Sequence, residues 1–498
     1  MEKRKITNGF WYVFPVLGTV FCIVYILAAT RDVVYSDYIR LVNSYLPDVW
    51  NPEKFFVADV LVRIPVNYLG RIVNVMLFGY STTFDMVLGA LSLGASAAVL
   101  SVYCREKRIG TLWYLLLMVM LFSLNKWEML TNGTGWCHFL AFWGFYYHYL
   151  ILDRVWGRQC REGEAALTDE EERRDRRERR CLCVLPWVLT LGAAGPYCGA
   201  YSAVLLLMYG ICFFLDRQKK KKADFRFLVY GLHVILPLVL YLISNACTVQ
   251  EYAGATGRDI GQVVGDNAGL FPRFLLKSFS SMVVGEEVLM DFLQKLNRGM
   301  ALCYLAGVLV LGAYLLALWM QVRYRLYRVS VLPLMFIFWG GLNHLLVLAA
   351  RWIFENSSYG MSSRYALQYQ VGILGIFLTF ALASRVNCEE TGKKERRKRA
   401  QAKRGEQKAV WQLRRLERTA ALLIAVVFCM GNVWTSVKEV QKAKYRKEYA
   451  QQVEEMALHY RDVPDDELEA RFQYRHGPER IRRALGILEE QGWNVFRE

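Results

Sequence analysis

The chain has 498 residues, of which 54% are hydrophobic and 14% aromatic, and it carries a formal net charge of +17. A soluble protein of this length would fold as two or three domains in which apolar stripes alternate with polar surface. Here the apolar residues instead form blocks of about twenty residues, the length of helix that crosses a hydrocarbon layer about 30 Å thick. The composition therefore excludes an ordinary soluble enzyme and predicts an all-α, polytopic membrane protein.

Eleven apolar blocks follow one another along the chain. They lie at residues 10–29, 82–103, 109–124, 135–152, 182–197, 199–215, 226–245, 300–321, 330–349, 366–385 and 419–436. We therefore expect about eleven transmembrane helices within residues 1–437, followed by a smaller helical tail over residues 438–498. Proline inside several blocks is compatible with this, because helices in a bilayer tolerate it where neighbouring groups satisfy the freed backbone.

Lys and Arg gather in alternate loops. With the N-terminus placed in the cytoplasm, the cytoplasmic segments hold 37 of these residues and the external loops hold 13. The longest basic segments are the cytoplasmic loops 153–181 and 385–418. Because cytoplasmic loops are enriched in Lys and Arg, this asymmetry predicts a multi-pass plasma-membrane protein with a cytoplasmic N-terminus and an external C-terminus. The basic runs suit anionic membrane lipids, and we expect no nucleic-acid partner.

Three segments assigned to the external side are long and mixed in polarity. Residues 30–81 carry aromatic and branched side chains at helical spacing, which predicts two amphipathic helices at the membrane interface. Residues 246–299 begin polar and then become amphipathic. In the tail, breaks at Pro464 and Gly477-Pro478 predict short helices. The tail is expected to attach through three apolar residues: Trp493, Val495 and Phe496.

Acidic residues follow the first span directly, at Asp32 and Asp37, with Arg40 close behind. A carboxylate at the mouth of an apolar bundle is partly desolvated and can act as a general base toward an acceptor hydroxyl or amine. The same residues also fit an ordinary charged helix end, and the sequence alone leaves both interpretations open.

Basic residues that suit a phosphate stand at other external boundaries. Lys126, followed by Glu128, lies where the third span emerges. Arg351 closes the ninth span, and Arg364-Tyr365 precedes the tenth. An Arg guanidinium offers a planar fork to phosphate oxygens. Lys126 fits an interfacial anchor equally well, and Arg364 fits a side chain that reaches from the bilayer to the headgroups.

Metal and cofactor signals are few. The pair Glu286-Glu287 lies in an apolar stretch, where two carboxylates can share a proton or hold a divalent cation, although exposed helix charges fit as well. The sequence has no GxxxxGK[ST] loop, no HExxH helix and no GxSxG elbow. We expect no protein-bound metal from clustered His and Cys, and a divalent cation at the carboxylates stays open.

Two short motifs carry a resemblance. The segment Ser36-Asp37-Tyr38 follows the first span, and Ser363-Arg364-Tyr365 precedes a late one. With a cytoplasmic N-terminus and a large first external loop, this arrangement resembles the GT-C superfamily of multi-pass glycosyltransferases, in particular bacterial members without an assigned activity. The resemblance implies Asp37 as the base, and Arg364 as the contact to the phosphate of a polyprenyl-phosphate-linked sugar. Members often have two adjacent acidic residues in the first loop, whereas Asp32 and Asp37 are separated, so the choice of base and any metal requirement stay open.

The resemblance predicts a hexosyl or pentosyl transferase that acts on a glycan, lipid or protein acceptor at the external face. Asp37 is expected to be catalytic, and the donor phosphate is expected to meet Arg364, Lys126 and Arg351. Supporting roles are expected for Asp32, Arg40, Glu128 and Tyr365. A transporter or flippase for lipid-linked saccharide is the alternative with a polar path to both faces, and a non-catalytic envelope scaffold is the alternative in which Asp37 and Arg364 stay apart.

Overall fold

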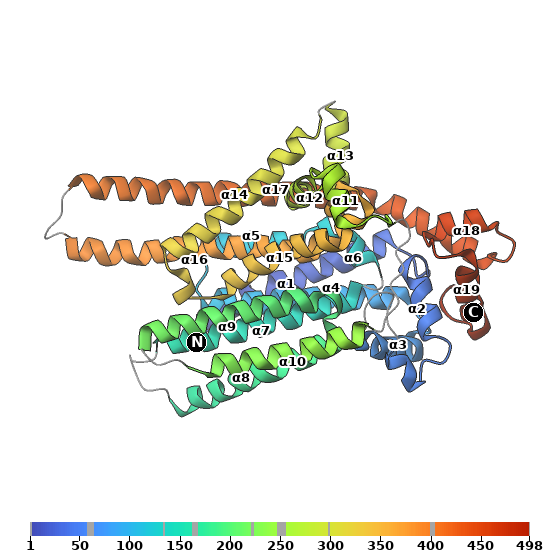
Figure 1. The fold of residues 1–498 in the computed structure, drawn as a ribbon, viewed down its shortest axis with the longest axis horizontal. Helices are drawn as coiled ribbons and strands as arrows, with labels where there is room; N and C mark the ends of the chain where they lie inside the picture. The colour runs from blue at the N-terminus through green and yellow to red at the C-terminus, as the bar shows by residue number, and fades with distance from the viewer. Residues whose placement is uncertain are drawn as a thin grey trace.

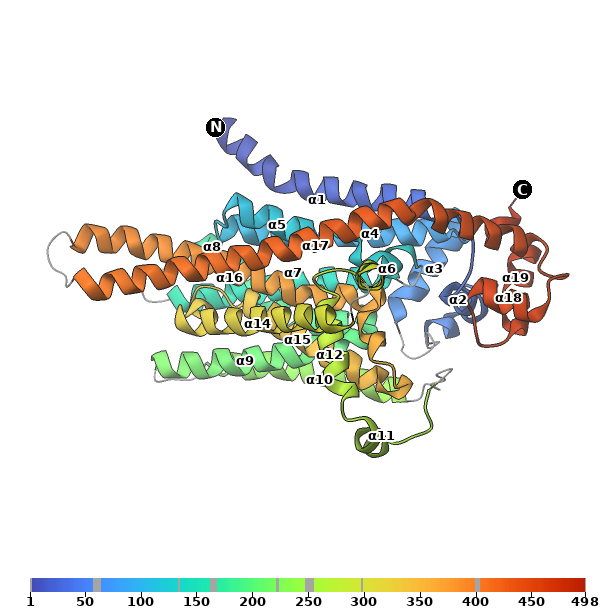
Figure 2. The ribbon, with the colours of Figure 1, turned by 90° about the horizontal axis from the view of Figure 1, so that it is seen from above.

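The computed structural model describes residues 2–56, 64–132, 135–161, 168–220, 224–246, 255–296, 299–398 and 404–497. Within these ranges every regular element is helical. The long helices run side by side along the longest axis of the molecule (Figures 1 and 2). They are α1 (Glu2–Ala29), α4 (Thr82–Glu106), α7 (Gly135–Arg161), α8 (Asp169–Val188), α9 (Cys198–Lys220), α10 (Arg226–Ala246), α14 (Ala301–Arg323), α15 (Leu332–Arg351), α16 (Ala366–Lys398) and α17 (Arg404–Leu458). The shorter α5 (Thr111–Leu121) lies among them (Figure 1).

The short helices gather toward one end of this bundle, away from the N-terminus and from the projecting ends of α16 and α17 (Figure 1). They are α2 (Asp37–Tyr45), α3 (Pro65–Phe78), α6 (Trp127–Thr131), α11 (Ile260–Asn267), α12 (Leu270–Ser280), α13 (Glu286–Lys295), α18 (Asp465–Phe472) and α19 (Pro478–Gln491). We call this end of the molecule the tail end, because the C-terminal helices lie there.

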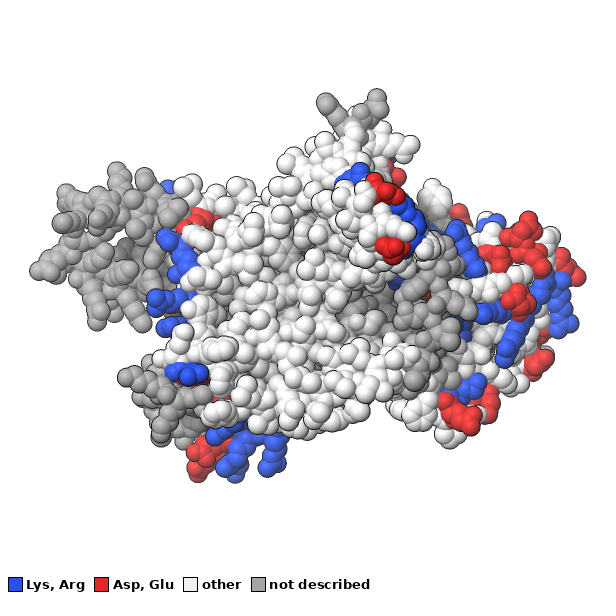
Figure 3. Space-filling model, in the orientation of Figure 1, with Lys and Arg blue, Asp and Glu red and all other residues white. Residues whose placement is uncertain are grey.

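Eight helices in the described ranges are long and apolar enough to cross a membrane. They cover Gly9–Ala29, Thr82–Glu106, Gly195–Gln218, Arg226–Ala246, Ala301–Arg323, Leu332–Phe354, Ser363–Arg385 and Arg415–Leu458. The chain is therefore a polytopic helical membrane protein, although the number eleven is not confirmed. Charge supports a membrane band: the face in Figure 3 carries its charged side chains toward the two ends, with a broad uncharged zone between them.

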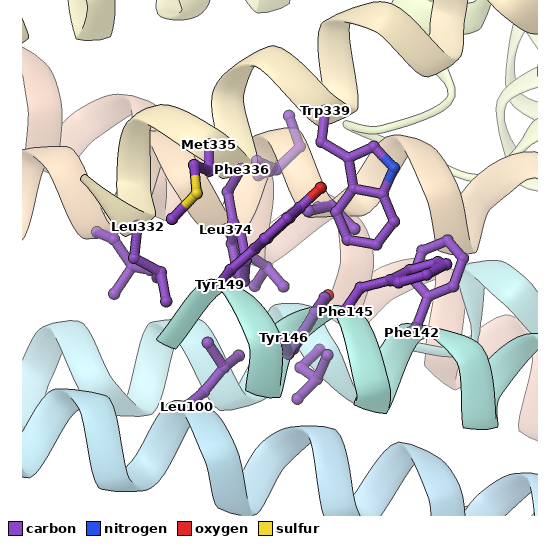
Figure 4. Close-up of a cluster of buried hydrophobic side chains, with 14 of the residues drawn as sticks. Leu100, Phe142, Phe145, Tyr146, Tyr149, Leu332, Met335, Phe336, Trp339 and Leu374 are labelled. Carbon is purple, nitrogen blue, oxygen red and sulfur yellow. The ribbon is translucent and has the colours of Figure 1, made fainter. Parts of the chain in front are cut away.

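The three predicted spans outside this set are helical, but each departs from a long, regular and uniformly apolar helix. The segment at 109–124 forms a helix of only 11 residues, and the segment at 182–197 passes through Pro186 into a π-helical turn at Leu189–Ala193. The segment at 135–152 belongs to α7, which has 27 residues but contains His and Tyr among its apolar positions. Four of its aromatic side chains pack on α15, with Phe142, Phe145, Tyr146 and Tyr149 around Trp339 (Figure 4), whereas Trp143 and Tyr147 are exposed. A helix surrounded by other helices needs less hydrophobicity than one that faces lipid, which explains why hydropathy and structure differ here.

The predicted boundary at residue 437 falls inside α17, which has 55 residues and continues unbroken into the tail. At about 1.5 Å per residue this helix is far longer than a bilayer is thick. The tail then turns back through α18 and α19, whose starts follow Pro464 and Gly477. The sequence breaks at these two positions thus coincide with the observed helix starts.

The two helices of the first loop have different environments. The apolar face of α2 is covered by α19, in a cluster that also includes Trp493, Val495 and Phe496. In contrast, α3 leaves apolar side chains exposed along one side: Leu69, Val73, Met76, Leu77 and Phe78. Only α3 therefore has the exposed apolar face expected of a helix lying in the membrane interface, whereas α2 uses its apolar face to hold the tail.

Candidate functional site

Three residues far apart in the sequence meet at the tail end of the bundle. Asp37 begins α2, Glu128 lies in α6, and Arg364 lies in the 3₁₀ turn that leads into α16. The Nη1 atom of Arg364 is 3.7 Å from Oδ2 of Asp37, and its Nε forms an ion pair with Oε1 of Glu128. We call these three residues the Asp37 cluster.

Neighbouring groups fix the orientation of both carboxylates in the Asp37 cluster. The Nη1 atom of Arg40 is 3.4 Å from Oδ1 of Asp37, and the Asn132 amide donates to Oδ2 of Asp37 at 2.9 Å. Ser363 donates from its hydroxyl to Oε2 of Glu128 at 3.0 Å. The side chains of Asp37, Glu128 and Arg364 nevertheless stay 27%, 24% and 43% exposed, so a ligand can still reach them.

The environment of Asp37 favours its ionised form. Burial opposes ionisation, but the positive charges of Arg40 and Arg364, together with the hydrogen bond from Asn132, outweigh it and hold the pKa of Asp37 below its usual value. Asp37 is therefore a carboxylate at neutral pH, which is the form that a general base requires.

The residue before Asp37 has an unusual backbone. Ser36 has φ 52°, a left-handed value that non-glycine residues rarely adopt. Its amide donates to the carbonyl of Phe472 at 2.8 Å, so the contact to the end of α18 helps to hold this conformation.

A small cavity of about 70 Å³ adjoins Glu128 and is also lined by Glu286, Ser362 and Thr435. Burial, helped by the charges of Glu287 and Glu128, raises the pKa of Glu286 to about 7. Its neighbour Glu287 instead pairs with Lys442 and Arg446 of α17, at 2.7 and 3.2 Å. The pair Glu286-Glu287 is thus split between two environments. In the described part of the chain, no group of three or more His, Cys, Asp or Glu side chains is placed to hold a metal ion.

Lys126 does not join the Asp37 cluster. It is 1% exposed, and its ammonium donates to the carbonyl of Ser123 at 2.9 Å. Burial lowers the pKa of Lys126 to about 7, because the charged form loses its hydration. We therefore correct the predicted contact of Lys126 with a donor phosphate: the side chain is enclosed in the bundle, and such a contact has no room.

Asp32, for which a supporting role was predicted, contacts the start of α4. Its Oδ1 accepts hydrogen bonds from the backbone amide and the hydroxyl of Thr82, at 2.6 and 2.8 Å. A carboxylate that accepts from the first amides of a helix stabilises the helix N-terminus, here that of α4. Asp32 therefore caps the N-terminus of α4, whereas Asp37 and Glu128 are the carboxylates that meet Arg364.

Arg351 and Tyr365 form a second pair next to Arg364. The Nε of Arg351 donates to the Tyr365 hydroxyl at 2.6 Å, and its guanidinium lies 5.8 Å from the ring centres of both Phe354 and Tyr365. The aromatic contacts hold this second guanidinium beside the turn that carries Arg364.

Two further polar residues at the tail end were not identified from the sequence. Asn132 orients Asp37, and Lys277 in α12 donates to the hydroxyls of Ser357 and Ser358, each at 2.9 Å. Lys277 is 8% exposed, and burial lowers its pKa. A lysine inside the apolar stretch Phe271-Pro-Arg-Phe-Leu-Leu-Lys277 is a signal that could have been used.

The residues of the site thus come from the first loop, from the two turns that precede α7 and α16, and from the segment between α10 and α14. Comparisons with protein-family models, with curated proteins and with solved structures give no match to this chain.

Proposed function

We propose that the protein is a membrane glycosyltransferase that moves a hexosyl or pentosyl group from a polyprenyl-phosphate donor to an envelope acceptor on the external face. The observation that carries this proposal is the meeting of an ionised carboxylate, Asp37, with a guanidinium, Arg364, at one end of a membrane-spanning helical bundle. Both side chains are partly exposed, and Asp37 begins α2, which lies at the tail end (Figure 1).

In the proposed reaction, Asp37 takes the proton from an acceptor hydroxyl as its oxygen attacks the anomeric carbon of the donor sugar. The bond between that carbon and the phosphate oxygen breaks, and polyprenyl phosphate leaves with the bonding electrons. Negative charge grows on the leaving phosphate, so Arg364, with Arg351 nearby, stabilises the transition state more than the ground state.

The resting cluster has a consequence for this chemistry. Arg364 is engaged by Asp37 and Glu128 when no donor is bound. A donor phosphate that draws Arg364 away from Asp37 removes one of the charges that depress the basicity of Asp37. Donor binding therefore makes Asp37 a stronger base at the moment when a base is needed.

Two alternatives predict different arrangements. A scaffold without catalysis would not require Asp37 and Arg364 to converge, yet their charged atoms are 3.7 Å apart. A flippase would use the Asp37 cluster only as one end of a path, and its substrate would be moved without a change in the glycan. A transferase and a flippase therefore differ in their effect: the transferase changes the structure of the glycan, and the flippase changes only its location.

Glycan profiling tests the proposal directly. Envelope glycans and lipid-linked saccharides from a deletion strain are compared by mass spectrometry with those of cells carrying the wild-type chain at its normal level. The proposal predicts the loss of one sugar from an envelope glycan, lipid or protein, together with accumulation of its unused donor. An unchanged glycan profile in the deletion strain contradicts it.

A further inference from the structure

A second and larger cavity, of about 390 Å³, lies beside the Asp37 cluster. Its walls come from the end of α1, the first loop, α6, α13, α17 and the residue that follows α18. Four aromatic side chains line it: Tyr35, Trp127, Tyr445 and Tyr449. A volume of this size falls in the range of about 300–1,000 Å³ that is typical of small-molecule sites. We call it the aromatic cavity.

The cations of the aromatic cavity are paired with carboxylates. Lys442 and Arg446 both pair with Glu287, at 2.7 and 3.2 Å, and Arg446 also pairs with Glu439 at 2.7 Å. The guanidinium of Arg446 lies 3.2 Å from the centre of the Trp127 ring. Lys442, Arg446 and Glu287 line the aromatic cavity, whereas Glu439 lines the small cavity at Glu128. Both cations of the lining are therefore already paired with carboxylates, and an anionic ligand would have to break those ion pairs. Such a lining suits a neutral ligand rich in hydroxyl groups better than it suits an anion.

The wall on the side of the tail is held in an unusual backbone conformation. Gln473, which lines the cavity, follows α18 and has φ 51°. Ser36, in the neighbouring segment that leads into α2, has φ 52°. The Ser36 amide donates to Phe472, and the Tyr449 hydroxyl donates to the carbonyl of Arg471 at 2.5 Å. Left-handed backbone at non-glycine residues persists where the surroundings hold it, and such residues cluster at ligand sites.

The aromatic cavity borders the Asp37 cluster through two residues. Trp127 lines both this cavity and the small cavity at Glu128. Tyr35 stands two residues before Asp37 and is close enough to interact electrostatically with Glu128 and Arg364. A ligand in the aromatic cavity can therefore present one of its hydroxyls toward the Asp37 cluster.

We infer that the aromatic cavity is the acceptor site, and that it takes the end of a neutral saccharide whose rings lie against Tyr445, Tyr449 and Trp127. Aromatic faces are negative, so they attract the polarised C–H face of a sugar ring. This inference rests on the proposed function, and it adds that the C-terminal tail builds part of the acceptor site. It chooses a glycan over a protein or a lipid headgroup as the acceptor.

Binding and transfer are measured separately to test it. The probe is the neutral glycan fraction released from the envelope of the deletion strain, which contains the acceptor that the missing enzyme leaves unmodified. Binding to the purified wild-type chain is followed by calorimetry. Tyr445→Ala is the main variant, because Tyr445 is 59% exposed and its removal leaves the fold intact. Tyr12→Ala removes a tyrosine that is 39% exposed and lies near the opposite end of the bundle, and it is the matched control.

We expect Tyr445→Ala and Tyr449→Ala to weaken glycan binding by ~5–10-fold, with an unchanged KM for the donor. Tyr449→Phe, which keeps the ring, should bind as the wild type does. Binding that is the same in wild type, Tyr445→Ala and Tyr449→Ala overturns the inference. The inference is also overturned if an anionic phospholipid micelle displaces the glycan from the wild type but not from Tyr445→Ala. Intact glycan binding in a chain that performs no transfer contradicts only the proposed function.

Discussion

Arg364 illustrates how much depends on one side chain, because it joins two carboxylates and is the proposed contact for the donor phosphate. Arg364→Ala removes a charge-assisted contact, so we expect kcat/KM for the donor to fall by ~10–100-fold, with part of the loss in KM. Arg364→Lys should restore only part of it, because an ammonium cannot reproduce the planar fork. Steady-state kinetics with the donor varied measures both effects.

The matched control for this series is Arg31→Ala, which removes an arginine 41% exposed that pairs with Glu454 near the same end of the molecule. It should leave transfer unchanged. If Arg364→Ala has the same donor KM and kcat as the wild type, Arg364 does not belong to the site.

Glu286 predicts a dependence of stability on pH. Its pKa is raised in the folded state to about 7, from an ordinary value near 4.5. The folded protein therefore holds this proton more tightly than the unfolded one, and the contribution to stability is present below pH 4.5 and is lost as pH rises through 7. The wild-type melting temperature should fall between pH 5 and pH 8 by more than that of Glu286→Gln. Thermal denaturation in detergent measures this, with exposed Glu53→Gln as control, and equal slopes for wild type and Glu286→Gln would contradict the assignment.

At the residue scale the sequence predicted part of the site and missed the rest for a physical reason. Asp37 and Arg364 were predicted from their places at the edges of apolar blocks and from the two short motifs that contain them, and the structure brings them together. Asp32 and Lys126 also lie at the edges of apolar blocks, but Asp32 caps the N-terminus of α4 and Lys126 is enclosed in the bundle. Whether a boundary residue faces a cavity or a neighbouring helix depends on packing, and a single sequence does not encode that in its spacing.

At the scale of elements, the junction between the first loop and the tail can be tested at Asn494. Its amide oxygen accepts from the amide of Val34 at 3.1 Å, and its Nδ2 donates to the carbonyl of Tyr80 at 3.0 Å and to Asp32 at 3.3 Å. Asn494→Ala removes these three hydrogen bonds, at a cost of about 1–3 kcal/mol for each buried group that the change leaves without a partner. We expect faster amide hydrogen exchange through α18 and α19 in the variant, while the transmembrane helices keep wild-type rates.

The matched control at this junction is Gln491→Ala, at the exposed end of α19. It should exchange as the wild type does. Equal protection of the tail in wild type and Asn494→Ala would show that this junction does not hold the tail.

The elements also show what periodicity can predict. The amphipathic patterns of the first loop correctly marked α2 and α3 as helices with one apolar face. They did not reveal that α19 covers the apolar face of α2, because the pattern gives the apolar side of a helix and not its partner. The same is true of α7, where Tyr146 and Tyr149, which lower its hydropathy, pack against Trp339 of α15 (Figure 4).

At the scale of the whole molecule, the alternation of basic loops predicts the orientation. The projecting ends of α16 and α17 should lie in the cytoplasm, and the tail outside. A reporter enzyme that is active only outside the cytoplasm should be active when fused after residue 450 and inactive when fused near residue 400. The reverse pattern would invert the molecule and place the Asp37 cluster on the cytoplasmic side.

The apolar blocks were sufficient to predict a polytopic helical membrane protein, because a helix of about twenty apolar residues has the length that crosses a bilayer. The number of spans was less predictable. Helices enclosed by others, such as α7, are released from the requirement for uniform hydrophobicity, and α17 extends well beyond the 18 residues of its apolar block at 419–436.

The central claim, that Asp37 is the base of a glycosyl transfer, is tested most directly by Asp37→Asn. The new side chain has nearly the same volume, can still accept from Asn132, and cannot take a proton at neutral pH. The measurement is donor-dependent sugar transfer by variant and wild type at equal protein level, with Asp32→Asn as the control carboxylate outside the site. The account predicts a loss of roughly 100- to 10,000-fold for Asp37→Asn and a mild effect for Asp32→Asn. Wild-type transfer by Asp37→Asn would contradict it.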